Sequence, residues 1–237
     1  MSGAGFVCML LVLGFLLQQG ILLLNNPSHR QYPVRGVDVS AWQGDIDWQA
    51  LSGQGIQFAY IKATEGSTWK DERFLENWLD AGSTTLAVGA YHFLSFESDG
   101  EAQAQNFIDA VPNQPDSLPC AVDVELYGKY MNAPPSKEQV DDLLKPLLAR
   151  LESHYGRKPI LYCTQQAYRL YIRDGYSDYP LWIRNVFTAP SLGEGQRWTF
   201  WQYADRGRLR GYKGRERFID MNVFRGSVDD FAAILQR

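Results

Sequence analysis

The chain has 237 residues, 45% of them hydrophobic, which suffices for one domain with a substantial core and falls short of two. Its formal net charge is −4 at pH 7, so it lacks the strongly basic balance of nucleic-acid-binding proteins, and no nucleic-acid partner is expected. The three cysteines have neither the spacing of a disulfide framework nor that of a zinc site. Cys120 and Cys163 are expected in separate strands, as two buried thiols or as a single bridge.

An apolar run occupies residues 6–24, which contain no charged side chain. Nineteen such residues are about the length that spans a bilayer, and they also suit the core of a long signal peptide. No Ala-x-Ala cleavage site follows and no Lys or Arg precedes the run, so we favour a retained anchor over cleavage. Residues 1–26 are therefore predicted to be a signal peptide or membrane anchor, 27–34 a polar linker and 35–237 the single folded domain.

From residue 35 onward, short apolar segments alternate with segments of helical periodicity. Strands are predicted at 35–40, 58–63, 86–94, 120–125, 159–164, 181–184, 199–203 and 218–224. Helices are predicted at 46–53, 72–81, 99–111, 136–155, 166–173 and 228–235. This alternation favours a mainly parallel α/β fold, and eight strands indicate an irregular (β/α) TIM-like barrel, with an open doubly wound sheet as the alternative. No glycine-rich phosphate loop follows the first strand, which weakens a nucleotide-binding interpretation.

Two acids lie in the C-terminal half of the fourth predicted strand, Asp123 and Glu125. Because successive strand residues point to opposite faces, both acids share one face, with α-carbons roughly 6.5–7 Å apart. Two close carboxyls repel in their ionised forms, so one of them tends to keep its proton near neutrality. A protonated carboxyl is what general acid catalysis at a glycosidic oxygen requires.

Two further acids are predicted to join this pair. In a β/α barrel the chemistry lies at the C-terminal ends of the strands, where Asp38 and the Asp123–Glu125 pair are located. Asp220 lies in the eighth predicted strand, which is the neighbour of the first when the barrel closes. Asp38 and Asp220 are therefore expected to meet on one side of the mouth and to face the other two acids across it.

Seven short segments follow one another between residues 35 and 224. They are GVDVSAWQG at 36–44 with IDW at 46–48, YIKATEG at 60–66, GAYHF at 89–93, DVE at 123–125, LWI at 181–183, FWQY at 200–203 and IDMNVF at 219–224. Together and in this order they closely resemble the glycoside hydrolase family 25 lysozymes, the N,O-diacetylmuramidases of the Chalaropsis type. The resemblance implies an irregular α/β barrel with an acidic groove. It also implies cleavage of the β-1,4 bond between N-acetylmuramic acid and N-acetylglucosamine in peptidoglycan.

The resemblance also implies roles for the four acids. Glu125 resembles the general acid that protonates the leaving oxygen. Asp123 resembles the residue that orients the substrate's 2-acetamido group, which would act as an internal nucleophile. Asp38 and Asp220 correspond to the other acids of the groove, which maintain charge balance and hydrogen-bond geometry. Direct attack by water, with one Asp as base, remains open, and the two routes predict different anomeric outcomes.

Further side chains are expected to contact the substrate or to pack beside the site. Tyr91 is a candidate donor to the acetamido group, and Lys62 is expected to offset the acids, to contact a substrate carboxylate or to form a structural ion pair. The candidates for lining the sugar subsites, with core packing as the alternative for each aromatic one, are Tyr162, Trp182, Trp201 and Gln202. Strand alternation turns His92 away from Tyr91, so it is expected to pack behind the site.

Three alternatives stay open at this stage. A chitinase-like hydrolase also carries D-x-E on a barrel strand, and a non-catalytic glycan-binding barrel would retain affinity without turnover. A metal-dependent deacetylase is disfavoured, because no His/Asp/Glu cluster has metal-ligand spacing; no metal or cofactor is expected. The favoured hypothesis is an exported muramidase acting on peptidoglycan strands, anchored in the membrane and facing the cell wall or periplasm, or secreted if the leader is cleaved.

Overall fold

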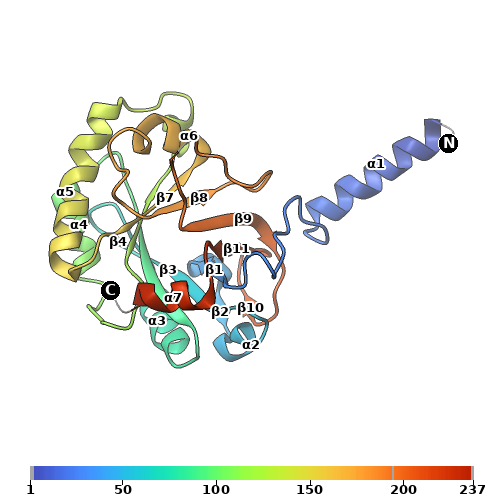
Figure 1. The fold of residues 1–237 in the computed structure, drawn as a ribbon, viewed down its shortest axis with the longest axis horizontal. Coiled ribbons are helices and arrows are strands. Elements are labelled where there is room, and N and C mark those ends of the chain that lie inside the picture. The colour runs from blue at the N-terminus through green and yellow to red at the C-terminus, as the bar shows by residue number, and fades with distance from the viewer. Residues whose placement is uncertain (1–2, 194, 236–237) are drawn as a thin grey trace.

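Eight strands close into a barrel in the computed structural model, which describes residues 3–193 and 195–235 (Figure 1). The strands are β1 (Arg35–Val39), β3 (Phe58–Glu65), β5 (Ala87–Phe93), β6 (Ala121–Val124), β7 (Ile160–Thr164), β8 (Leu181–Arg184), β9 (Phe200–Gly207) and β11 (Ile219–Phe224). They pair in this order, and β1 closes the barrel by pairing with both β3 and β11. The predicted barrel is confirmed, and the open doubly wound sheet is excluded.

The direction of the last strand was not predicted. The barrel strands from β1 to β9 all pair in parallel, whereas β11 is antiparallel to both of its neighbours, β9 and β1. Asp220 is the second residue of β11, and this reversal therefore places it at the end of the barrel where the parallel strands finish. There it lies opposite Asp38 in the strand register.

Helices cover the outside of the barrel. They are α2 (Trp48–Ser52), α3 (Phe74–Gly82), α4 (Gly100–Ile108), α5 (Lys137–Tyr155), α6 (Gln165–Ala167), which continues as the π-helical turn η3 (Tyr168–Ile172), and α7 (Val228–Leu235). The longest, α5, begins at the capping box of Ser136 with Gln139 and ends at Gly156, whose φ of 70° is the left-handed conformation that glycine adopts readily. It packs beside α4 on one flank of the barrel (Figure 1).

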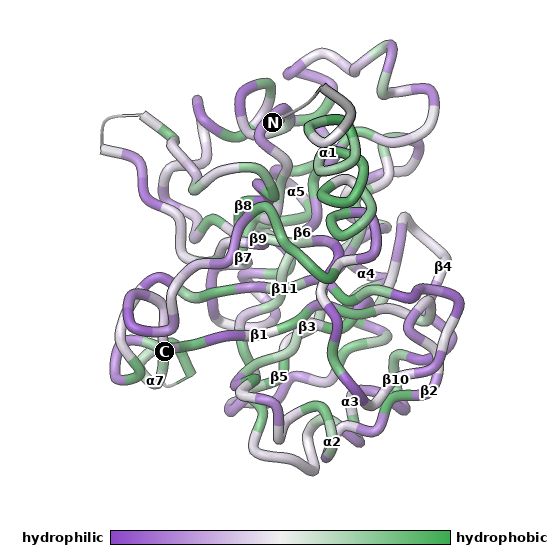
Figure 2. The backbone as a smooth tube through the Cα atoms, turned by 90° about the vertical axis from the view of Figure 1, so that its right-hand side faces the viewer, coloured by the Kyte–Doolittle hydropathy of each residue, from purple (hydrophilic) through white to green (hydrophobic). Residues whose placement is uncertain are grey.

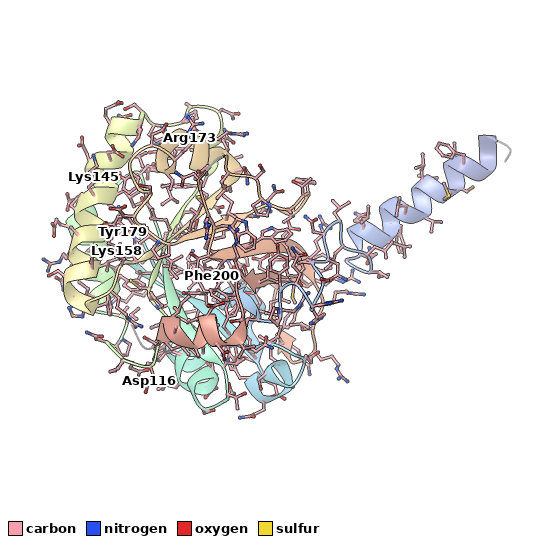
Figure 3. All side chains as sticks on the ribbon, viewed as in Figure 1. Asp116, Lys145, Lys158, Arg173, Tyr179 and Phe200 are labelled. Atoms are coloured by element: carbon pink, nitrogen blue, oxygen red, sulfur yellow. The ribbon has the colours of Figure 1, made fainter. Side chains whose placement is uncertain are left out.

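The interior of the barrel is filled largely by aromatic rings. Phe58, Tyr60, Trp182 and Phe200 are fully buried there, and Phe200 lies near the middle of the barrel in Figure 3. Gly36 makes room for this packing, because a side chain at its position would overlap the Phe58 ring. A second apolar layer, between the strands and the helices, contains the outward-facing aliphatic residues of the same strands. Two-sided burial of this kind is the rule for parallel sheets and holds the strand ends in fixed positions.

Three short strands and two helical turns complete the chain. Strand β2 (Asp45–Ile46) pairs with β10 (Tyr212–Lys213), and β4 (Trp69–Lys70) pairs with the end of β3. The 3₁₀ turns η1 (Ala41–Gln43) and η2 (Gly128–Met131) follow β1 and β6 respectively. All of these segments except β2 and β10 come directly after, or next to, the C-terminal end of a barrel strand, so they add to the rim of the mouth.

Helix α1 (Gly3–Gln18) projects away from the barrel, and Figure 2 shows it hydrophobic over most of its length (Figures 1 and 2). Among the residues that the structure describes, no helix is both long and apolar enough to cross a membrane. The predicted anchor is not supported by this finding. Cys120 and Cys163 are both buried free thiols, so the disulfide left open from the sequence does not form between them.

Candidate active site

A groove crosses the mouth of the barrel at the ends of the parallel strands. Its central cleft encloses about 600 Å³, part of it open to solvent. The cleft is lined by Asp38, Ser40, Trp42, Lys62, Tyr91, Phe93, Asp123, Glu125, Tyr162, Trp182, Gln202 and Asp220. The groove continues past Trp42 and Phe218 on one side, and past Met131, Arg169 and Phe187 on the other. An open groove of this form suits a polymer better than a small enclosed molecule.

Asp38 is held by a network of side chains on neighbouring strands. Its Oδ2 accepts hydrogen bonds from Gln202 Nε2 at 2.9 Å and from Asn222 Nδ2 at 2.7 Å. Each amide oxygen accepts in turn from an aromatic donor: Tyr162 Oη donates to Gln202 at 3.0 Å, and Trp182 Nε1 donates to Asn222 at 2.8 Å. Because the indole nitrogen can only donate, it fixes the amide of Asn222 with its NH₂ group toward Asp38. The network therefore orients Asp38 rigidly at the floor of the groove.

Asp220 forms a pair with Asp38. Burial raises the pKa of both carboxyls, and the neighbouring Asp38 charge raises the pKa of Asp220 further. The amide donors of Gln202 and Asn222 lower the pKa of Asp38 and partly offset the effect of its burial. As the pH rises, Asp220 is therefore the member of this pair that gives up its proton last.

Asp123 and Glu125 face the groove from β6 and from the residue after it, while Val122 and Val124 point into the outer core. Burial raises the pKa of Asp123 well above its ordinary value, and the Glu125 charge adds to the effect. Oδ1 of Asp123 is buried and accepts no hydrogen bond from any described residue. Burial also raises the pKa of Glu125, although the charge of Arg184 opposes the shift. The pair thus combines raised pKa values with one unsatisfied acceptor.

Lys62 lines the cleft beside the acids and forms an ion pair with Glu65. Its Nζ is 2.7 Å from Glu65 Oε2, and it also lies over the rings of Trp69 and Phe93, at 4.7 and 4.9 Å from their centroids. Its charge lowers the pKa of Asp123. Tyr91 lines the same cleft, and burial raises its pKa well above the ordinary value, so its hydroxyl stays a neutral donor.

The structure does not bring Trp201 to the groove. Neighbouring residues of β9 point to opposite faces, and Gln202 occupies the inward position. The Trp201 ring is buried in the outer core, with Trp198 at a centroid distance of 5.8 Å, and its Nε1 donates to the Asn185 carbonyl at 2.8 Å. The other five predicted contact residues, namely Tyr91, Lys62, Tyr162, Trp182 and Gln202, all line the cleft.

His92 packs behind the site. Its Nδ1 lies 2.7 Å from Thr64 Oγ1 and its Nε2 lies 3.0 Å from Gln103 Oε1, both in buried surroundings. Burial lowers its pKa from 6.5 to about 4, so the ring is neutral at pH 7. This position outside the groove matches the expectation from strand alternation.

Asn222 and Arg184 belong to the site but were not predicted from the sequence. Asn222 lies on the same face of β11 as Asp220, and that alternation was the available signal. Arg184 ends β8, two residues after Trp182, and its Nη2 lies 2.7 Å from Asp205 Oδ2. Its charge lowers the pKa of Asp38, Glu125 and Asp220. Within residues 3–193 and 195–235, no three His, Cys, Asp or Glu side chains are grouped so as to hold a metal ion.

Two carboxyl pairs, each with one buried and one half-buried member, lie in an aromatic groove at the mouth of an α/β barrel and define a protein of the glycoside hydrolase class. The sequence profile of the family described as "Glycosyl hydrolases family 25" matches residues 37–212, and the chain belongs to this family.

Known proteins similar to this chain come from bacteria and fungi. A family 25 glycosyl hydrolase from Bacillus anthracis has a solved structure that superposes with a TM-score of 0.83 at 50% identity, covering 88% of this chain and 95% of that one. Lysozyme M1 of Streptomyces globisporus is 33% identical over 85% of this chain and 71% of its own length. The N,O-diacetylmuramidase of Chalaropsis sp. is 28% identical over 83% of this chain and 96% of its own length.

Proposed function

We propose that this glycoside hydrolase is a lysozyme that cleaves the β-1,4 bond between N-acetylmuramic acid and N-acetylglucosamine in peptidoglycan. The observation that carries the proposal is the Asp123–Glu125 pair at the mouth of a family 25 barrel, in which Asp123 is buried and Glu125 half-buried. Relatives named lysozyme and N,O-diacetylmuramidase support the choice of substrate. The open groove on both sides of the cleft suits a long glycan strand.

Glu125 is the proposed general acid. It follows the last residue of β6, its pKa is raised by burial, and it lines both the central cleft and the part of the groove beyond Tyr162. A carboxyl with a raised pKa keeps its proton to higher pH than an ordinary glutamic acid, and it delivers that proton to the glycosidic oxygen as the bond breaks. The leaving sugar then departs as a neutral alcohol.

Asp123 is the proposed partner of the substrate's 2-acetamido group. Its unpaired Oδ1 is a buried acceptor for the acetamido N–H. A hydrogen bond to that oxygen favours the ionised form of Asp123. Because the two carboxyls titrate together, ionisation of Asp123 favours retention of the proton by Glu125. Substrate binding would thus set the protonation state that catalysis needs.

The acetamido oxygen then attacks the anomeric carbon as the bond to the leaving oxygen breaks. Water subsequently opens the cyclic intermediate and gives its proton to Glu125, and the product keeps the starting anomeric configuration. In this proposal the hydroxyl of Tyr91, which lines the cleft, donates to the acetamido group, and Asp38 with its partner Asp220 lies at the floor of the groove. The competing route, direct attack by water with an Asp as base, inverts the configuration, so the first anomer seen by NMR separates the two.

A peptidoglycan substrate implies that the protein acts outside the cytoplasm. We infer that the apolar residues 6–24 direct export, with the leader either cleaved or retained. N-terminal sequencing of the protein recovered from its own cell envelope separates these outcomes.

A chitinase-like activity is the second candidate, because the D-x-E pair on β6 also serves hydrolases of N-acetylglucosamine polymers. Soluble chitin oligomers discriminate between the two, since the favoured reaction needs muramic acid.

The decisive experiment identifies the new reducing ends. The full chain digests purified peptidoglycan, the products are reduced with borohydride, and mass spectrometry identifies the reduced sugar. We expect reduced N-acetylmuramic acid. Reduced N-acetylglucosamine would overturn the bond assignment. Absence of product would favour the glycan-binding interpretation, and the Glu125→Gln protein serves as the control for contaminating activity.

A further inference from the structure

A cluster of cations lies at the end of β9 and in the connection from β9 to β11. We name it the cationic rim, and its members are Arg206, Arg208, Arg210, Lys213, Arg215 and Arg217. All six side chains are exposed, and between residues 206 and 217 the sequence has a single acid, Glu216. In the described part of the chain, none of the six lies within 4.0 Å of a carboxylate. This density of unpaired positive charge contrasts with the net charge of −4.

The cationic rim is fixed to one edge of the groove. Strand β10 within it pairs with β2, and the Glu216 backbone N–H donates to the Trp42 carbonyl at 2.9 Å. Gly214 permits this close approach, since a side chain there would collide with that same carbonyl oxygen. Glu216 and Phe218 line the groove next to Trp42. The cations are therefore presented at the border of the groove rather than on a remote loop.

Three of the cations stack on rings that line the groove. The Arg215 guanidinium lies 5.6 Å from the Trp42 ring centroid, and those of Arg206 and Arg217 lie 5.5 and 5.6 Å from the Phe218 ring centroid. Such stacking leaves the planar N–H groups of Arg215 and Arg217 free to contact an anion bidentately, whereas Arg206 Nη1 already donates to the Gln18 carbonyl at 2.7 Å. Nearby acids do not neutralise the rim, because Asp45 pairs with Arg73 and Asp205 pairs with Arg184.

We propose that the cationic rim binds the carboxylates of the peptide stems on the glycan strand that occupies the groove; this inference rests on the proposed function. Where its muramic-acid carboxyls are bound to stems through amide bonds, the glycan backbone of peptidoglycan is uncharged, whereas the peptide stems carry carboxylates at regular intervals. The acids on the groove floor repel these carboxylates, and the rim attracts them. Arginine forks match carboxylate geometry, so several weak contacts along one strand would add up. The rim thus selects strands that carry peptides.

The test compares two triple variants with equal change of charge. The rim variant carries Lys213→Gln, Arg215→Gln and Arg217→Gln. The control carries Lys145→Gln, Arg150→Gln and Lys158→Gln, whose exposed side chains lie on or beyond α5 and away from the groove. Each is assayed on soluble glycan strands with peptide stems, and on the same strands after an amidase has removed the stems and the muramic-acid carboxylates exposed by that cleavage have been converted to neutral amides.

We expect the native protein and the control to have a lower KM for strands with stems, and the rim variant to lose this preference through a roughly tenfold rise in KM at unchanged kcat. The difference should vanish as salt shortens the Debye length from about 30 to about 8 Å. Equal KM values for native protein and rim variant on strands with stems would overturn the inference. The inference would also be overturned if the rim variant differed from the native protein only on cell walls that carry phosphodiester polymers.

Failure of the proposed function is distinguishable from failure of this inference. If the proposed function is wrong, the native protein cleaves neither the strands with stems nor the strands without them. The affinity of each protein for uncleaved strands, measured by co-sedimentation with Glu125→Gln in every background, then still reports on the rim. A preference of the native rim for strands with stems supports the inference, and equal binding of both kinds of strand contradicts it.

Discussion

The carboxyl groups of the groove differ in what surrounds them. Asp38 accepts two amide hydrogen bonds on one oxygen, whereas Oδ1 of Asp123 accepts none from the described residues. Hydrogen bonds to a carboxylate favour its ionised form, and burial without them favours the protonated form. Differences of this kind let neighbouring acids take different roles in one site.

The charge of Arg184 tunes the proposed general acid, which leads to a pH prediction. Arg184 lowers the pKa of Glu125, so Arg184→Gln should raise that pKa. Glu125 then stays protonated to higher pH, and the alkaline limb of the kcat/KM profile should move upward. This profile reports the free enzyme. Arg150→Gln removes an equal charge outside the groove and should leave the limb in place; an unmoved or downward-shifted limb in Arg184→Gln contradicts the assignment.

At the residue scale, the sequence predicted the four acids and most of their surroundings. Strand alternation predicted that Asp123 and Glu125 share a face, whereas Asp38 and Asp220 were predicted from the strand ends and the closure of the barrel. Alternation also explains the misplacement of Trp201, because two consecutive strand residues do not face the same groove and Gln202 holds the inward position. Arg184 was missed because its effect on the acids is electrostatic and leaves no periodic signal.

At the scale of elements, the reversal of β11 is the feature that completes the site. Side-chain alternation is identical in a parallel and an antiparallel strand, so the sequence pattern predicts the strand but not its direction. The two-residue strands β2, β4 and β10 are too short to produce a periodic pattern. The long helix α5 was predicted to within one residue, because its capping box and terminal glycine are local signals.

Close packing inside the barrel makes Gly36 sensitive to substitution. Gly36→Ala would force its methyl group into the Phe58 ring, and overpacking of this kind costs about 1–3 kcal/mol. For a chain of this length we expect a Tm lower by about 2–4 °C for each kcal/mol. Gly82→Ala is the matched control, because a side chain there meets nothing within 4 Å. Equal Tm values for Gly36→Ala and the native protein would contradict the packing described.

At the scale of the whole molecule, the acids of the active site lower the stability of the folded protein. The groove carboxyls have pKa values raised by burial, so their ionisation at neutral pH costs folding free energy. Their unfavourable contribution is relieved as the pH falls through the raised pKa values. His92 acts in the opposite direction: its pKa of about 4 lies below the ordinary 6.5, so it disfavours the folded state as the pH falls from 6.5 to 4.

Removal of one groove acid should therefore stabilise the protein. Asp220→Asn keeps a donor toward Asp38 and eliminates the buried charge, so we expect a higher Tm at pH 7 and lower activity. The gain should shrink toward acidic pH, where the native Asp220 is protonated as well. Calorimetry at several pH values measures the difference in Tm between Asp220→Asn and the native protein. His92 is present in both proteins, so its contribution cancels. A Tm at pH 7 equal to or below that of the native protein would argue against a destabilising acid cluster.

The most direct test of the account concerns Glu125 as general acid. Glu125→Gln is compared with the native protein on peptidoglycan and on a muramic-acid glycoside whose nitrophenolate leaving group needs no protonation. We predict a loss of roughly 10²–10⁴-fold on peptidoglycan and little loss on the nitrophenyl glycoside. Circular dichroism checks that the fold is retained. Equal losses on both substrates, or unchanged cleavage of peptidoglycan, would contradict the assignment of Glu125.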